Sequence, residues 1–306
     1  MMNIPAKRIQ YYQAKQINTL PQLSKFSAHE RLQMQAIAAV LPFRSNNYVV
    51  EELIDWAQVP DDPIYRLTFP HSEMLPEPAL NQVVELLARE ADELELQPVV
   101  KQIRRQLNPN PAGQKKYNVP MLFDEPVPGI QHKYKQTVLV FPSAGQTCHA
   151  YCTFCFRWPQ FVKLDEDTKF ATRESGRFID YLRHHREVTD VLFTGGDPMT
   201  MSAKVLARYV EPLLQPEFDH IQTIRIGTKS ISYWPYRYVT DKDADEIMQL
   251  FERVVQRGKH LALMSLSQNG SSGCSITCDV SSFRSNFFYH LGAHVFDSVL
   301  QLNFFG

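Results

Sequence analysis

The sequence lacks an excess of charge of either sign and a long uninterrupted run of apolar residues. Its 32 basic and 33 acidic residues leave a formal net charge of -1, which offers little attraction to a phosphate backbone or an anionic membrane surface. No apolar run approaches the roughly 20 residues that span a bilayer, and the polar segment 1–16 has no apolar core of a secretory signal. We therefore expect a cytoplasmic protein without a nucleic-acid or membrane partner.

Cysteine is also scarce, and its distribution does not suit a disulfide framework. Of five cysteines, three lie within eight residues, at Cys148, Cys152 and Cys155, while Cys274 and Cys278 lie far along the chain. An odd number clustered in this way is more typical of a metal site than of paired disulfides. The 44% of apolar residues suffices for a sizeable packed core.

The chain divides into three regions by its patterning. Residues 1–128 carry helical signals, at 27–41 behind the capping residue Ser27 and at 77–107, where Pro98 is expected to interrupt the helix. Residues 129–264 alternate short β-branched runs with amphipathic helices, which is typical of βα units around a parallel sheet. In this region we expect strands at 137–141, 190–194, 221–226 and 260–264, and helices at 174–185, 202–214 and 243–257.

The alternation stops after residue 264. The segment 265–306 has no lysine or glutamate, a single arginine at Arg284, and nine serines. It does not continue the preceding pattern and is treated as a divergent tail. The expected fold is therefore α/β, with a partial βα barrel preceded by a helical N-terminal region.

The cysteine cluster has the spacing CxxxCxxC and follows the first expected strand of the βα series directly. Three thiolates in one loop can each bond one iron of a 4Fe-4S cluster, which usually takes four cysteines, so that the fourth iron is left without a protein ligand. The alternatives are a zinc site or three ordinary buried thiols. Zinc favours two CxxC pairs, and no second pair with that spacing occurs.

A second feature is the run Gly195, Gly196, Asp197 and Pro198, which follows the second expected strand. Two glycines allow the backbone to approach a ligand closely, and parallel α/β sheets bind ligands at the carboxyl ends of their strands. On its own such a run is more often an ordinary turn. Its position relative to the cysteines favours a ligand-binding role.

Taken together, these segments resemble the lysine 2,3-aminomutase family of the radical S-adenosylmethionine (SAM) superfamily. The resemblance covers about residues 50 to 264, and the segments that carry it are 62–64, 126–129, 132–134, the cysteine loop with Arg157, 195–198 and 224–228. It implies an isomerase that moves an amino group between the α and β carbons of a small amino-acid substrate. The cofactors would be a 4Fe-4S cluster, SAM and pyridoxal phosphate (PLP), with an electron donor of unknown identity and a possible homo-oligomer.

The resemblance also assigns residues to roles. Cys148, Cys152 and Cys155 would bind the cluster, whose open iron would chelate SAM, and one electron would cleave SAM to methionine and a 5'-deoxyadenosyl radical. Arg157 would bind the substrate carboxylate, a task suited to a bidentate guanidinium; the alternative is a surface salt bridge. The residues expected to contact cofactor are Phe154, Gly195, Gly196, Asp197, Arg225 and Gly227, while His149 is expected to be structural or solvent-facing and not a ligand.

The sequence departs from the family in the region that should bind PLP. The Schiff-base lysine is expected from a later βα unit, but the last lysine of the chain is Lys259, and Thr137 stands where the family has an arginine. We expect that 265–306 is not the family's own C-terminus, through a frameshift or a truncation. Two alternatives stay open, a PLP-independent radical SAM enzyme acting on another small substrate and an inactive remnant or interaction module.

Overall fold

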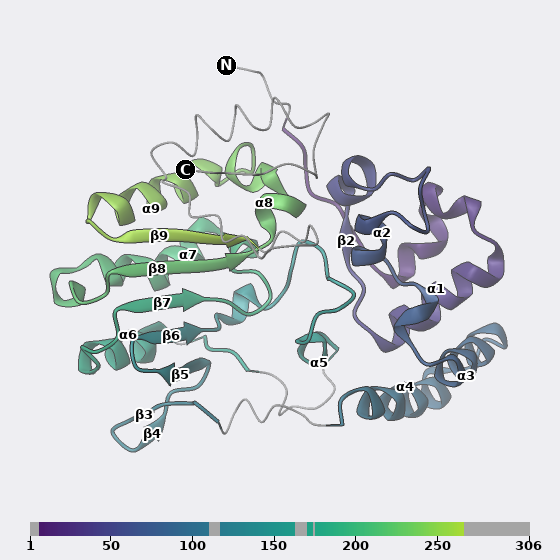
Figure 1. Ribbon diagram of the computed structural model, residues 1–306, viewed down its shortest axis with the longest axis horizontal. Coiled ribbons are helices and arrows are strands. Elements are labelled where there is room, and N and C mark those ends of the chain that lie inside the picture. Colours follow the sequence, from purple (N-terminus) through teal and green to yellow (C-terminus); the bar gives the residue numbers. More distant parts are fainter. Residues whose placement is uncertain (1–5, 110–116, 163–169, 174, 266–306) are drawn as a thin grey trace. The chain divides into compact units, whose positions relative to one another are not determined.

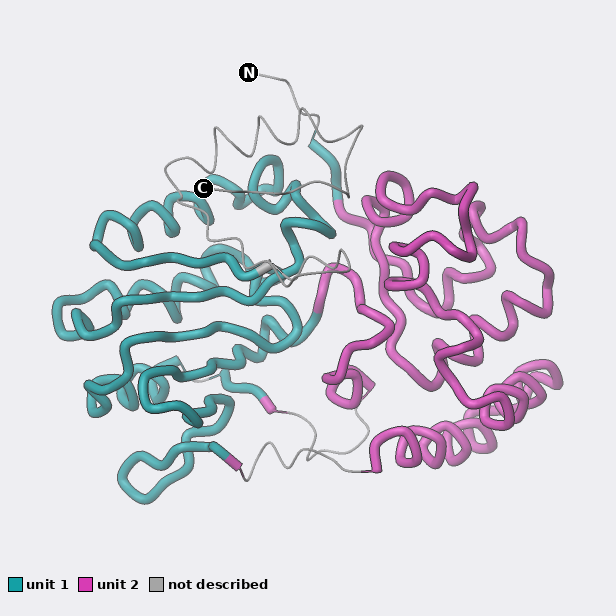
Figure 2. Tube along the Cα trace, in the orientation of Figure 1, with its two compact units in different colours: residues 1–8, 118–147, 171–306 teal, residues 9–117, 148–170 magenta. Residues whose placement is uncertain are grey.

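The computed structural model describes residues 6–109, 117–162, 170–173 and 175–265. They form two compact units, drawn in teal and magenta in Figure 2. Unit 1 contains residues 6–8 and the described parts of 118–147 and 171–265, and unit 2 contains the described parts of 9–117 and 148–170. The units are not continuous in sequence, whereas the sequence suggested a boundary at residues 128 and 129. The cysteine segment clusters with the N-terminal helices.

Unit 1 is built on a five-stranded sheet with the strand order β5-β6-β7-β8-β9 (Figure 1). Its strands are β5 (Ile130–Tyr134), β6 (Thr137–Val140), β7 (Asp190–Phe193), β8 (Thr223–Thr228) and β9 (His260–Ser265). Strands β6 to β9 are parallel and β5 is antiparallel to β6. Each parallel strand is added beside the one before it, without the reversal of a doubly wound sheet. The expected α/β class with a parallel sheet is confirmed, and the partial barrel stays a prediction.

Helices cover one face of this sheet because the strand residues alternate in burial. Val138, Val191 and Ile224 are fully buried and share one apolar cluster with side chains of the flanking helices, whereas Leu139 and Leu192 on the other face are only partly buried. The α-helices of unit 1 are α6 (Ser175–His184), α7 (Ala203–Val210), α8 (Ser230–Tyr233) and α9 (Ala244–Gln256). The strand order carries the turns after β6, β7 and β8 to a common edge of the sheet.

Short elements complete unit 1. The hairpin of β3 (Met121–Leu122) and β4 (Glu125–Pro126) precedes the sheet. Short 3-10 helices lie at η5 (Ser143–Gly145), η7 (Pro198–Thr200), η8 (Glu211–Leu214), η9 (Pro216–Phe218) and η10 (Pro235–Tyr238). The predicted helix 202–214 is thus α7 followed by η8, because Pro212 lacks the amide hydrogen that an α-helix would need.

Unit 2 is mainly helical. Its α-helices are α1 (Ala28–Val40), α2 (Pro63–Thr68), α3 (Glu77–Ala88), α4 (Glu93–Leu107) and α5 (Trp158–Phe161). Shorter 3-10 helices lie at η1 (Ala14–Thr19), η2 (Pro21–Lys25) and η4 (Ser72–Met74), and a π-helix lies at η3 (Val49–Leu53). Strands β1 (Tyr11–Tyr12) and β2 (Ser45–Asn46) pair antiparallel. Helices α1, α3 and α4 bury one shared apolar cluster that includes Ile37, Val83 and Val100. The expected cap is present, since Ser27 accepts a hydrogen bond from the Glu30 amide.

The predicted interruption at Pro98 is wrong. Helix α4 runs through Pro98, and the break between α3 and α4 lies at Glu90, which adopts a φ of 54°. Asp92 then caps α4 by accepting a hydrogen bond from the Glu95 amide. The carbonyl that Pro98 leaves without an intrahelical donor is that of Leu94, an exposed residue near the helix start where water can take its place.

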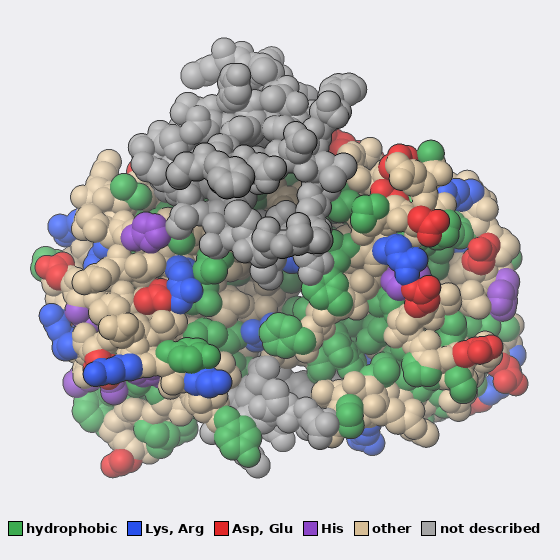
Figure 3. Space-filling model, in the orientation of Figure 1, with side chains coloured by type: hydrophobic (Ala, Val, Ile, Leu, Met, Phe, Trp, Pro, Cys, Tyr) green, Lys and Arg blue, Asp and Glu red, His purple; other side chains and the backbone are tan. Residues whose placement is uncertain are grey.

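The surface has no dominant sign of charge on the visible side. Figure 3 shows acidic and basic side chains interspersed over the described parts of each unit. In the ranges that the structure describes, none of the helices has the length and apolar character needed to cross a bilayer.

Candidate functional site

The cysteine loop of unit 2 holds three thiols in one turn-rich segment. Cys148, Cys152 and Cys155 are each partly buried and carry thiols rather than disulfides. The Cys155 amide donates to the Cys152 carbonyl at 3.1 Å, which closes a turn between the last two cysteines. Between the first two, His149 and Ala150 are 3% and 2% exposed, so they anchor the loop while the thiols stay accessible.

Backbone hydrogen bonds fix this loop to elements far away in sequence. The Tyr151 amide donates to the Arg44 carbonyl at 2.8 Å, and the Thr153 amide donates to the Leu67 carbonyl at 2.9 Å. The Thr153 hydroxyl donates to the Arg66 carbonyl at 2.9 Å. All of these partners lie in α2 or in the segment around β2, so the N-terminal helices position the cysteines.

The His149 carbonyl accepts a hydrogen bond from Asn46 Nδ2 at 3.0 Å. With its buried side chain, this favours the structural role expected for His149 over a role as a ligand. Phe154, expected to contact a cofactor, is 53% exposed. Its cofactor contact stays a prediction.

Arg157 lies two residues after the last cysteine, at the start of α5, and its guanidinium is largely buried. Burial lowers the pKa of this guanidinium to about 10, while the nearby thiols of Cys155 and Cys148 act in the opposite direction. The group is thus a cation at neutral pH beside two of the three cysteines. Its Nη2 donates to Gln160 Oε1 at 3.2 Å.

Across the described ranges, no three His, Cys, Asp or Glu side chains are arranged so that they could hold one metal ion. The ligands of a single zinc ion all bond one centre, whereas the thiolates of a 4Fe-4S cube each bond a different iron. The three thiols lie on one anchored loop near the Arg157 cation, and thiolates are the donor type that an iron-sulfur cluster requires.

The glycine turn belongs to unit 1 and follows β7. Gly195 has a φ of 139°, a conformation that favours glycine. The next residues enter η7, where the Met199 amide donates to Asp197 Oδ1 at 2.9 Å. The structure thus places the turn at the carboxyl end of β7, as the sequence suggested.

Asp197, expected to contact a cofactor, is 2% exposed and its carboxylate is occupied by protein donors. Oδ1 accepts from the Thr228 hydroxyl at 2.7 Å, and Oδ2 accepts from the Lys229 amide at 2.9 Å. The Thr228 hydroxyl is hydrogen-bonded in turn to Ser230, and Ser230 to the Tyr238 hydroxyl at 2.6 Å. The carboxylate therefore ties the turn after β7 to the end of β8.

Arg225 and Gly227 lie on the face of β8 that is only partly buried. Arg225 forms a two-pronged ion pair with Asp190, the first residue of β7, and its Nε donates to Asp190 Oδ1 at 2.8 Å. Asp190 Oδ2 also accepts from the Thr137 hydroxyl at 2.9 Å. The pair lies toward the beginning of the strands, away from the edge that carries the glycine turn, whereas Gly227 lies near that edge.

Lys259 is the last lysine of the chain and the one to be judged as a possible Schiff-base partner for PLP. This residue is 6% exposed, and its ammonium donates to the carbonyls of Phe218 and Ile221 at 2.8 and 2.6 Å. It precedes β9, at the edge opposite the glycine turn, and burial lowers its pKa. Lys259 does not fit the role of a PLP-binding lysine. The tail 266–306 with Cys274 and Cys278 lies outside the described residues.

Arg237 is a buried residue of the turn region that the sequence did not reveal. It lies in η10, is 4% exposed and donates from Nη1 to Asp243 Oδ1 at 2.7 Å. Its Nε and Nη2 also donate to the carbonyls of Met199 and Met201, each at 2.8 Å. Arginine side chains are mostly exposed, and the sequence offered only nearby acidic residues as a sign of a pair. Asp241 and Asp243 follow four and six positions later, and Asp241 Oδ2 also lies 3.8 Å from Arg237 Nη1.

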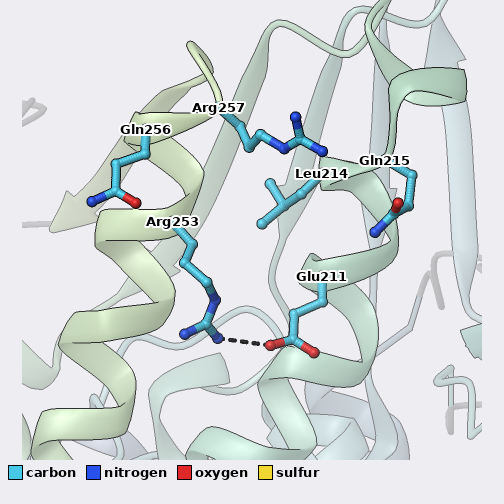
Figure 4. Close-up of a pocket in the computed structure, with 6 residues that line it drawn as sticks. All are labelled: Glu211, Leu214, Gln215, Arg253, Gln256 and Arg257. Atoms are coloured by element: carbon cyan, nitrogen blue, oxygen red, sulfur yellow. Dashed lines mark hydrogen bonds and ion pairs between the residues drawn. The ribbon is translucent and has the colours of Figure 1, made fainter.

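A surface cavity of about 360 Å³ lies between η8 and α9 (Figure 4). Arg253 and Glu211 face each other across it and form an ion pair of 2.7 Å. Arg257 is a second basic residue on the lining. None of the residues singled out from the sequence lines it.

Known proteins are similar to this chain in sequence over part of their length. No protein-family model matches the chain. A putative L-lysine 2,3-aminomutase of Aquifex aeolicus is 28% identical over 251 residues, which are 82% of this chain and 55% of that protein. The L-lysine 2,3-aminomutase of Clostridium subterminale is 33% identical over 114 residues, 37% of this chain and 26% of that protein.

This chain is similar in sequence to lysine 2,3-aminomutases. The resemblance predicted from the motifs is confirmed by these relatives and by the L-lysine 2,3-aminomutase of Haemophilus influenzae, which is 32% identical over 117 residues, 38% of this chain and 32% of that protein. The chain spans about half the length of the Aquifex relative. The activity of these relatives is therefore carried over only as a proposal.

Proposed function

We propose that this aminomutase-like chain is a radical SAM enzyme acting on a small amino-acid substrate, with the amino group moving between the α and β carbons. The observation that carries the proposal is the loop in which Cys148, Cys152 and Cys155 present partly buried thiols from a backbone anchored to the N-terminal helices. The similarity to L-lysine 2,3-aminomutases supports the same chemistry.

Each residue has a defined task in this proposal. The three cysteines would hold a 4Fe-4S cluster, and a one-electron donor is required as a partner. When bound, the cluster and SAM supply reductive cleavage of the sulfonium C–S bond and hence abstraction of a hydrogen atom from substrate. Arg157 stays protonated at neutral pH and offers its guanidinium to a carboxylate, so it would orient the amino acid. The Gly195–Gly196 turn would present backbone groups to SAM at the sheet edge, and Gly227 would leave room for it there.

The proposal is tested by the product of SAM cleavage. Anaerobically reconstituted protein is incubated with SAM and dithionite, and 5'-deoxyadenosine is measured by chromatography. We expect product from the wild type and from Cys274→Ser, and none from the triple variant Cys148→Ser, Cys152→Ser, Cys155→Ser. Equal amounts from the wild type and the triple variant would refute the role of the loop.

A PLP-independent reaction is the second candidate, and one observation favours it. The last lysine of the chain, Lys259, is engaged by two carbonyls at the opposite sheet edge. If PLP remains with the protein through gel filtration and is released by hydroxylamine, this second candidate is rejected in favour of the aminomutase reaction. If no PLP is retained, the isomerase reaction is rejected for this chain.

A further inference from the structure

The glycine pair after β7 is required by the packing of the protein itself. A Cβ atom on Gly196 would lie 2.4 Å from the carbonyl oxygen and 2.5 Å from the amide nitrogen of Thr147. A Cβ atom on Gly195 would lie 2.0 Å from Nε2 of Gln146. Real Cβ atoms do not approach so closely, and a backbone obstacle cannot move aside as a rotamer can. Both obstacles belong to the segment that leads into the cysteine loop.

Hydrogen bonds fasten the same segment to the turn. The Asp197 amide donates to the Thr147 carbonyl at 2.6 Å and to the Gly145 carbonyl at 3.0 Å. Gln146 Nε2 donates to the Pro142 carbonyl at 3.0 Å, so its side chain is also held on this side of the turn. Thr147 is therefore fixed by backbone contacts, and Cys148 is the next residue in the chain.

The glycine turn is itself held by side chains from two other segments. The Asp197 carboxylate binds it to the end of β8 through the Lys229 amide. Arg237 binds the carbonyls of Met199 and Met201 directly after it, and its partner Asp243 accepts from the amide that starts α7 at 2.7 Å. A turn held by two buried charged groups is rigid enough to position what packs on it.

We propose that the Gly196–Asp197 turn is a positioning element for Thr147, and through the Thr147–Cys148 peptide bond for the start of the cysteine loop. The inference rests on the proposed function, in which Cys148 is a cluster ligand. The glycine turn would then help the protein to retain the cluster, in addition to any contact that the turn makes with SAM. Gly196 and Asp197 are positioning residues, and neither needs to touch the cofactor to do this.

The test compares two glycine-to-alanine variants in the full chain. Gly196→Ala places a methyl group against the Thr147 backbone, whereas Gly176→Ala in α6 is the matched control because no heavy atom lies within 4 Å of its Cβ position. After anaerobic reconstitution and gel filtration, iron per chain is measured together with the EPR spectrum of the reduced protein. We expect Gly196→Ala to retain about threefold less iron than the wild type, since overpacking against backbone is not relieved by repacking. Gly176→Ala should retain as much iron as the wild type.

The outcomes separate this inference from the proposed function. Unchanged iron in Gly196→Ala together with lost SAM binding would overturn the inference, because the glycine would then serve only the ligand. If the wild type itself takes up no iron, the proposed function fails. The inference is then tested by amide hydrogen exchange in residues 143–147. Faster exchange in Gly196→Ala than in the wild type supports the inference, and unchanged exchange overturns it. Should Gly196→Ala not fold, Asp197→Asn, which keeps the volume and weakens the bond from the Lys229 amide, is judged by the same readouts.

Discussion

The cysteine loop of unit 2 and the glycine turn of unit 1 are held in different ways. The loop is anchored by neutral hydrogen bonds from its backbone and from Thr153 to carbonyls of neighbouring segments. The turn is anchored by charged side chains, the buried Asp197 on one side and the buried Arg237 with the partly buried Asp243 on the other. Neutral hydrogen bonds contribute about 1 kcal/mol each, whereas removing one member of a buried ion pair costs about 3–5 kcal/mol. The turn should therefore be the more sensitive of the two to single substitutions.

The largest effect is expected at Arg237. In Arg237→Met, Asp243 and the carbonyls of Met199 and Met201 lose buried donors, and we expect the free energy of unfolding to fall by about 3–5 kcal/mol in urea denaturation. The matched control is Arg253→Met, which breaks an exposed pair with Glu211 and should cost about 1 kcal/mol or less. Similar losses in the two variants would contradict the role given to the buried pair.

The next effect concerns Arg157, the buried cation on the side of the cysteine loop. Arg157→Met should raise the KM for an amino-acid substrate about 30-fold or more, because a charge-assisted hydrogen bond to a carboxylate is worth about 2–3 kcal/mol. Arg157→Lys keeps the positive charge and should restore part of the affinity for the substrate. The control is Arg66→Met, which removes an exposed partner of Glu73 in the same unit and should leave the KM unchanged. A KM at the wild-type value in Arg157→Met, with iron content intact, would refute carboxylate binding.

A smaller effect is expected at Thr153. Thr153→Val removes the hydroxyl that donates to the Arg66 carbonyl and should lower the free energy of unfolding by about 1 kcal/mol. Thr19→Val, which removes an exposed hydroxyl that donates to the Gln16 carbonyl, is the control and should change stability less. A loss at Thr153 as large as that at Arg237 would abolish the contrast between the loop and the turn.

The smallest effect is a pH dependence at Asp243. Burial opposes ionisation of this carboxyl, but the hydrogen bonds from Arg237 and from the Ala203 amide outweigh it, so its pKa lies below the ordinary value of 3.8. A group whose folded-state pKa is lowered contributes stability above the unfolded pKa, and that contribution is lost as pH falls through the folded pKa. The stability difference between wild type and Asp243→Asn should therefore be constant at pH 5–7 and shrink below pH 3.8. A difference that grows on acidification would contradict the lowered pKa.

The sequence predicted the parts of the fold that depend on local periodicity. The helix behind Ser27, the strands that became β6, β7 and β9, and the helix α9 all follow from the spacing of apolar residues. Strand β5 was missed because Ile130–Tyr134 has only one buried residue and pairs antiparallel at the sheet edge. The helix break was placed at Pro98 instead of Glu90, since a positive φ at a glutamate has no signature in the sequence.

The sequence indicated the candidate site residues whose spacing along the chain is typical of a ligand-binding motif. It did not indicate the residues whose roles depend on tertiary packing. The cysteine spacing, and the position of the Gly195 turn relative to it, singled out these segments in the sequence, and their cofactor roles stay predictions. The structure adds a packing reason for the glycines, because they receive Gln146 and Thr147 of the same chain. The ion pair of Arg225 with Asp190, 35 positions away in sequence, is a long-range pair that cannot be seen without the fold. Arg237 and Asp243 escaped notice for the same reason.

The most direct test of the account is the metal content of the purified chain. Anaerobic reconstitution with iron and sulfide, followed by gel filtration, should yield about four irons per chain, with an EPR spectrum of the reduced protein that changes when SAM is added. The variant Cys148→Ser, Cys152→Ser, Cys155→Ser should retain none of this iron. A single tightly bound zinc ion, or equal iron in the wild type and the triple variant, would contradict the claim that these three thiols hold an iron-sulfur cluster with one iron open to SAM.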